Sequence, residues 1–151
     1  MTVNPELVGR RFALAEPYLV GREHVRAFAA AVFATNPIHV DVAKAREAGY
    51  ADVVAPTTYP AVLQDRGLQL LLADPAADFE LKNVVHADES FTYVRPIVAG
   101  DELTAELEVT NVRAVRGNSM LQATTVITDA EGSEVVTAYA TLVVGGQEDD
   151  R

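Results

Sequence analysis

The sequence contains no cysteine, so neither a disulfide framework nor a thiolate metal site can form. It has no apolar run near the roughly 20 residues that a transmembrane helix needs, and its first residues lack a signal-peptide pattern. Basic residues are scarce, because 12 Lys and Arg stand against 22 Asp and Glu, which gives a net charge of −10. Since nucleic acids bind basic surfaces, this balance argues against a nucleic-acid partner. These absences favour a cytoplasmic protein with no membrane partner, and we expect no cofactor or metal.

The chain has 151 residues, of which 49% are hydrophobic, so it is long enough to bury one sizeable core. We expect a single domain over residues 1–145 and a disordered acidic tail over 146–151. Four basic side chains are close enough in sequence to form a local patch, although ordinary solvated surface is the simpler interpretation: Arg10, Arg11, Arg22 and Arg26.

The first half of the chain has mostly helical periodicity, after a possible first strand over residues 12–20. Apolar residues recur at helical spacing over 23–33, and a short helix is predicted over 42–48, which Gly49 should end. A longer helix is expected over 57–72, capped by Thr57 or Thr58.

The second half of the chain alternates between apolar and polar residues with period two, which is typical of strands. The predicted strands cover 84–94, 103–110, 121–127 and 135–144. Helices followed by a run of strands indicate an α+β fold. One long apolar helix suggests that an antiparallel sheet wraps around it. Such a sheet has an edge that dimerisation would cover.

Residues 36–41, between the first two predicted helices, read Asn-Pro-Ile-His-Val-Asp. Pro37 disfavours a helical residue before it, so the first helix should end here. The turn then carries an amide, an imidazole and a carboxylate, and such turns commonly hold functional sites. The simpler alternative is a structural link, in which Asp41 caps the second helix and His39 merely lies near the surface.

Residues 36–41 resemble the end of the hydratase-2 motif, Gly-Asp-x-Asn-Pro-φ-His-x-Asp, of MaoC-like dehydratases and (R)-specific enoyl hydratases. Two further segments match in the same order: Ala-Pro-Thr at 55–57, and Phe-x-Tyr-x-Arg-Pro-Ile-x-Ala-Gly-Asp-x-Leu at 91–103. The resemblance covers roughly residues 8–144 and is greatest to the N-terminal MaoC dehydratase domain, including HadA-like subunits of fatty-acid dehydratases. It implies a hot-dog fold, with the sheet around a central helix, paired into a double hot-dog dimer.

The resemblance also implies a reaction, the reversible hydration of a trans-2-enoyl thioester of coenzyme A or acyl carrier protein. It identifies His39 and Asn36 as catalytic residues. The backbone amide of Thr57, where the family has glycine, would stabilise the enolate oxygen. The apolar residues of the central helix that are expected to line a tunnel for the acyl chain are Tyr59, Val62 and Leu63.

The chain departs from the motif at its catalytic aspartate, because the position five residues before His39 is Ala34 and the preceding glycine is Phe33. Losing one member of an acid–base pair commonly costs about 10²–10⁴ in rate. The favoured hypothesis is therefore an acyl-binding subunit that forms a heterodimer with a catalytic MaoC-like chain. The alternatives are a self-sufficient hydratase, as a homodimer that uses His39 with a borrowed carboxylate, and a hot-dog thioesterase that uses Asp65.

Other polar residues near the motif carry weaker signals. Asp52, Asp88 and His86 lie near it in sequence order, but their placement in space does not follow from the sequence. His86 is more simply a satisfied strand histidine, and His24, at a helix start, carries less signal still.

Overall fold

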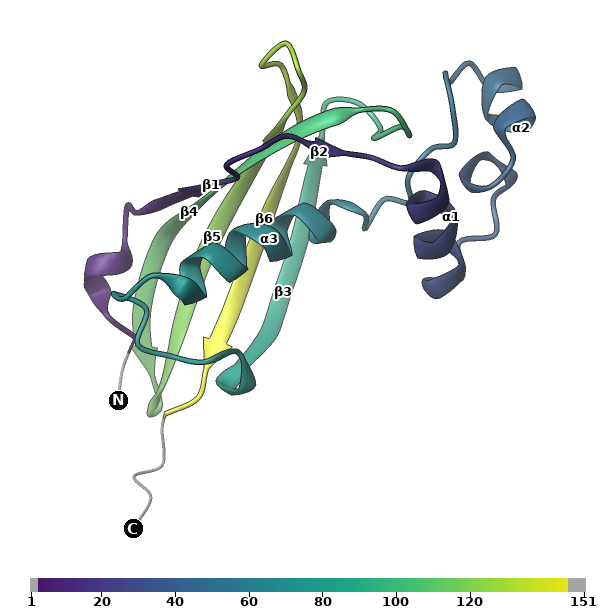
Figure 1. The fold of residues 1–151 in the computed structure, drawn as a ribbon. Helices are drawn as coiled ribbons and strands as arrows, with labels where there is room; N and C mark the ends of the chain where they lie inside the picture. The colour runs from purple at the N-terminus through teal and green to yellow at the C-terminus, as the bar shows by residue number, and fades with distance from the viewer. Residues whose placement is uncertain (1–2, 147–151) are drawn as a thin grey trace.

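The computed structural model describes residues 3–146 and has an antiparallel sheet curved around one long helix (Figure 1). This is the hot-dog arrangement that the sequence resemblance implies. The helices are α1 (Arg22–Ala31), α2 (Val42–Glu47) and α3 (Pro60–Ala73). Short 3-10 turns cover Pro5–Leu7, Pro37–His39 and Leu81–Asn83.

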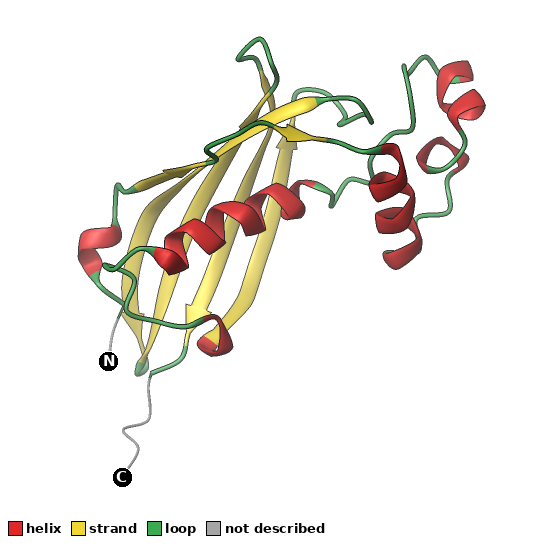
Figure 2. Cartoon of the chain, viewed as in Figure 1, coloured by secondary structure: helices red, strands yellow, loops and turns green. Residues whose placement is uncertain are grey.

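The sheet has six strands in the order β1-β4-β5-β6-β3, with β2 paired to the end of β4, and every pairing is antiparallel (Figure 2). The strands are β1 (Arg11–Ala13), β2 (Tyr18–Leu19), β3 (Val84–Tyr93), β4 (Glu102–Val115), β5 (Asn118–Thr128) and β6 (Glu134–Val144). The predicted first strand over 12–20 is therefore two short strands, separated by a break that includes Pro17.

Helix α3 lies across the concave face of the sheet, where alternate side chains of β4 and β5 are buried against it (Figure 1). Gly67 lies against β4, and a Cβ atom built there would be 2.9 Å from Leu107 Cβ. No real Cβ atom packs that closely. This explains why a residue that costs about 1 kcal/mol relative to alanine in a helix occupies this position.

The N-terminus of α3 differs from the sequence prediction. The helix begins at Pro60, a residue suited to the first helical position because its missing amide proton is not needed there. Thr57 and Thr58 lie in the turn before it, and the capping position is Tyr59, whose side chain makes no capping hydrogen bond. The expected threonine cap is thus wrong. At the C-terminal end of α2, Gly49 has the expected positive φ, of 99°.

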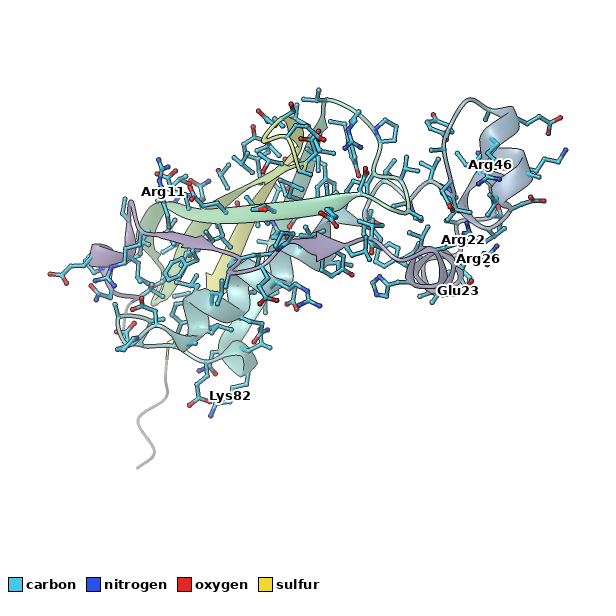
Figure 3. All side chains as sticks on the ribbon, turned by 45° about the horizontal axis from the view of Figure 1, so that its top comes forward. Arg11, Arg22, Glu23, Arg26, Arg46 and Lys82 are labelled. Carbon is cyan, nitrogen blue, oxygen red and sulfur yellow. The ribbon has the colours of Figure 1, made fainter. Side chains whose placement is uncertain are left out.

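The four arginines considered as a patch do not gather. Figure 3 shows Arg11 at the opposite end of the molecule from Arg22 and Arg26. Arg10 pairs with Asp74, Arg11 with Glu106 and Glu108, Arg22 with Asp52, and Arg26 with Glu23. They are ordinary surface ion pairs, as the simpler interpretation had it.

Across residues 3–146, every helix falls short of the length and apolar character that a membrane crossing requires. Nearly all of the predicted acidic tail, residues 147–151, lies outside the described residues.

Candidate functional site

The end of α1 explains the glycine that the hydratase motif usually has at position 33. The Ala34 amide donates to the Ala29 carbonyl at 2.9 Å, and the Phe33 amide donates to the Ala30 carbonyl at 3.3 Å. These two bonds close a helix C-terminus of the type that needs a left-handed residue, usually glycine. Here Phe33 takes this conformation, with φ 58°. The left-handed backbone at this position therefore accounts for the motif glycine. Phe33 adopts the same conformation at a cost in free energy.

Phe33 does not obstruct the site, because its side chain points into solvent and is 87% exposed. We expect Phe33→Gly to stabilise the protein by about 0.5–1 kcal/mol. Relief of left-handed strain, about 1–2 kcal/mol, outweighs the added chain entropy of glycine, about 0.5–1 kcal/mol. Urea unfolding measures the change. A loss of stability would mean that the phenyl ring makes stabilising contacts.

The segment after position 34 is held by its own polar side chains. The Asn36 side chain accepts a hydrogen bond from the Ile38 amide at 3.2 Å and so caps the 3-10 turn that Pro37 begins. The Asp41 side chain accepts from the Lys44 amide at 3.2 Å and caps α2, as the sequence predicted. Two of the motif's polar residues thus shape the turn, and they present the histidine between them.

His39 is fixed in one orientation by the connector between α2 and α3. Its Nδ1 lies 2.5 Å from the Val54 carbonyl oxygen, and the Val54 amide donates to the Ile38 carbonyl at 2.9 Å. Because a carbonyl oxygen only accepts, Nδ1 carries the proton in the neutral ring. Nε2 is then left with a free lone pair, which is the form that a general base requires.

The same connector brings the Thr57 turn beside His39. The Ala55 amide donates to the Ile97 carbonyl at 2.8 Å, which ties the connector to the segment after β3. The Tyr93 hydroxyl donates to the Thr57 carbonyl at 2.7 Å, and burial raises the pKa of Tyr93 to about 12, so this donor stays protonated. Within residues 3–146 the Thr57 amide has no hydrogen-bond acceptor.

Together these elements line an open cavity of about 510 Å³, with mostly apolar walls and a few placed polar groups. The cavity is lined by Asn36, Ile38, His39, Tyr50, Val54, Ala55, Thr57, Tyr93, Val94, Arg95 and Pro96. None of these lining residues is an aspartate or glutamate. The imidazole, one free amide and an apolar wall are suited to hold an acyl thioester, while the second acid–base group of the motif is missing.

The carboxylates considered as substitutes are not among the residues that line this cavity. Asp52 forms a two-point ion pair with Arg22 at 2.7 and 3.0 Å, and this hydrogen bonding lowers the pKa of Asp52. Asp88 and Asp65 line two other hollows of the surface. His86 lies with Asp65 and not with His39.

Three of the predicted site residues come together in this cavity, namely His39, Asn36 and Thr57, and Ala34 lies half-buried in the same turn. The three predicted tunnel residues do not line it. Tyr59 and Leu63 are fully buried in the core cluster at this end of α3, and Val62 packs against that cluster. Their helix face is turned toward the sheet, so they belong to the core behind the pocket.

Tyr59 has a structural role that the sequence did not indicate. Its hydroxyl lies 2.8 Å from His24 Nδ1 and 3.3 Å from the Tyr18 hydroxyl, which links α1 and β2 to the start of α3. Burial raises the pKa of Tyr59, so it remains a neutral hydrogen-bonding phenol.

Sequence reasoning gave no role to three pocket residues: Tyr50, Tyr93 and Arg95. The last two belong to the Tyr-x-Arg-Pro segment that matches the family, and that match was the available signal. Arg95 donates to the Asp101 carboxylate at 2.8 and 3.2 Å and lies 3.6 Å from that of Asp129. Its charge is therefore neutralised within the chain, and it fixes the two turns at the pocket rim.

Solved structures with the same architecture place the fold in one class, the dehydratase-type hot-dog proteins. The HadBC (3R)-hydroxyacyl-ACP dehydratase complex of Mycobacterium tuberculosis matches with a TM-score of 0.84 at 27% identity, over 93% of this chain and 98% of the other. The (R)-hydratase of A. caviae matches with a TM-score of 0.66 at 28% identity, over 89% and 94%.

The family model described as FAS1-like, dehydratase domain region, matches residues 6–138, so the chain belongs to this family. A relative called UPF0336 protein, from Clavibacter michiganensis, is 55% identical over 98% of this chain and 99% of its own length. The hot-dog fold and the MaoC-like dehydratase relationship expected from three short motifs are confirmed.

Proposed function

We propose that the chain is the acyl-binding, HadA-like subunit of a (3R)-hydroxyacyl-thioester dehydratase of fatty-acyl metabolism, active only with a catalytic MaoC-like partner. The observation that carries this proposal is the His39 cavity without a carboxylate. The cavity walls suit the acyl thioester of coenzyme A or acyl carrier protein. The partner's own site, with a complete aspartate–histidine pair, performs the hydration.

The chemistry explains why one histidine is insufficient. Hydration requires a base to take a proton from water while oxygen bonds to C3, and an acid to deliver a proton to C2. His39 Nε2 supplies one group in the right form. The second group is absent, because position 34 carries a methyl side chain and no aspartate or glutamate is among the residues that line the cavity. The HadBC structure, a complex of two hot-dog subunits, supports the pairing by analogy.

Reconstitution tests the proposal. The purified chain is mixed with a purified MaoC-like chain from the same cells that carries the intact Gly-Asp-x-Asn-Pro-x-His motif. We expect a stable 1:1 complex whose hydratase activity survives His39→Ala in this chain. The same activity must be lost when the partner's motif histidine is replaced. Activity that instead depends on His39 would contradict the proposal.

One observation favours a second function, a self-sufficient hydratase. The Val54 carbonyl holds His39 in the tautomer that a base needs, which a purely structural histidine does not require. Under this alternative the chain is a homodimer, and the native protein hydrates crotonyl-coenzyme A without a partner. The thioesterase alternative is less supported, since Asp65 lies in a groove apart from the His39 cavity.

A further inference from the structure

The His39 cavity stops short of the central helix. None of its lining residues belongs to α3. Two of them connect it to the buried cluster that contains Tyr59 and Leu63, because Ala55 is a member of that cluster and Tyr93 packs against it. The cavity therefore ends at the cluster. The space between α3 and the sheet, where a tunnel for an acyl chain was expected, is filled by side chains.

Tyr59 is the largest fully buried side chain of the described residues, and it lies where such a tunnel would begin. It directly precedes α3 and follows the Thr57 turn at the cavity wall. Its ring makes edge contacts with the rings of Phe28, at 5.2 Å between centroids, and His24, at 5.6 Å. Edge-to-face contacts between rings are favourable, so α1 holds the Tyr59 ring in place.

Hydrogen bonds fix the other end of the Tyr59 side chain. Its hydroxyl lies 2.8 Å from His24 Nδ1 and 3.3 Å from the Tyr18 hydroxyl, and α1 and β2 both lie beside the N-terminal end of α3 (Figure 1). The Arg66 guanidinium of α3 lies 4.8 Å from the centre of the Tyr18 ring, a cation–π contact that holds Tyr18 in turn. If Tyr59 turned aside, its hydroxyl would lose both partners inside the core, which costs free energy. Tyr59 is therefore a fixed wall.

We propose that Tyr59 closes the acyl site at the start of α3, so that this subunit accepts only short acyl chains. The inference rests on the proposed function, because it concerns the acyl thioester that the His39 cavity binds. The thioester lies beside His39 and Thr57, and the first carbons of the acyl group occupy the apolar part of the cavity. The carbons of a longer chain find no space along α3 and extend into solvent through the open side. Tyr59 thus determines the length of the acyl chain.

A series of saturated acyl-coenzyme A thioesters, which cannot be hydrated, tests the proposal on the purified native chain. Displacement of labelled butanoyl-coenzyme A measures each affinity, so that binding outside the shared site is not counted. We expect the affinity to level off by octanoyl-coenzyme A, with the dodecanoyl thioester within about 3-fold of it, because methylenes that stay in water contribute little. A tunnel along α3 would bury the four additional methylenes, each worth about 4-fold, and would tighten binding about 100-fold or more. Such tightening would overturn the proposal.

Tyr59→Ala removes the wall. In this variant the dodecanoyl thioester should bind at least about 10-fold more tightly than the octanoyl thioester, since the space left by the ring admits several methylenes. Leu63→Ala is the matched control, because it empties space in the same cluster and leaves Tyr59 in place, so its series should stay level. A folded Tyr59→Ala protein without the gain, or an equal gain with Leu63→Ala, would contradict the role of Tyr59.

The series on the native chain decides the proposal by itself if Tyr59→Ala does not fold. It also separates the two levels of the argument. A native chain that binds butanoyl-coenzyme A and whose affinity climbs steadily up to the dodecanoyl thioester overturns the length limit and leaves the proposed function standing. A native chain that binds no acyl thioester overturns the proposed function and the length limit with it.

Discussion

Ala34→Asp should raise the rate at which this chain alone hydrates crotonyl-coenzyme A, by about 10-fold or more. The substitution restores a carboxylate five residues before His39, in the turn that already orients the imidazole through the Val54 carbonyl. A positioned acid–base group is worth about 10²–10⁴ in rate, and part of that should return with the side chain. The loss of the conjugated enoyl absorbance measures the reaction.

Two matched variants separate this effect from a general change in the pocket. Ala34→Asn has nearly the same shape as the aspartate but no base, and should give no gain. Ala34→Asp combined with His39→Ala should return the rate to that of the native chain. Because Phe33 points into solvent, it needs no change for this test. A gain with Ala34→Asn would show that shape, and not acid–base chemistry, limits the native chain.

Leu63→Ala should lower the free energy of unfolding by about 2–5 kcal/mol, the range for a fully buried leucine in a close-packed core. Leu63 has no exposed surface and lies in the cluster with Tyr59, Leu103 and Ile127. If it instead lined an open acyl tunnel, shortening it would leave no closed cavity, and the loss would be smaller. Urea unfolding of the two proteins measures the difference.

Val62→Ala is the control on the same helix. Val62 is only half-buried, so its truncation should lower the free energy of unfolding by about 1 kcal/mol or less, well below the decrease expected for Leu63→Ala. A larger cost at Val62 than at Leu63 would contradict the packing described here.

The sequence predicted the elements well where local chemistry decides them. Period-two alternation identified the strands, Gly49 marked the end of α2, and Asp41 was recognised as its cap. These features depend on residues close together in sequence. The three motif matches then placed His39 and Thr57 in one pocket, which local patterns alone did not do.

The threonine cap expected for α3 was a local error, and the other errors arose where three-dimensional packing decides. Helical periodicity showed that Tyr59 and Leu63 share an apolar face, but not whether that face meets the sheet or a ligand. Likewise, nothing in the sequence around His86 revealed the bulge that turns it toward Glu89, since a bulge depends on the register with β6. The sequence did not predict the groove lined by Asp65, His86 and Glu89 either, since that groove depends on the same register.

The hydratase rate of the purified native chain, compared with that of its His39→Ala variant, tests the central claim most directly. If the site binds acyl thioesters but lacks the second acid–base group, crotonyl-coenzyme A is hydrated very slowly by both proteins and at similar rates. Brisk hydration by the native chain that His39→Ala abolishes would contradict the claim, and a group other than the motif aspartate would then complete the catalytic pair.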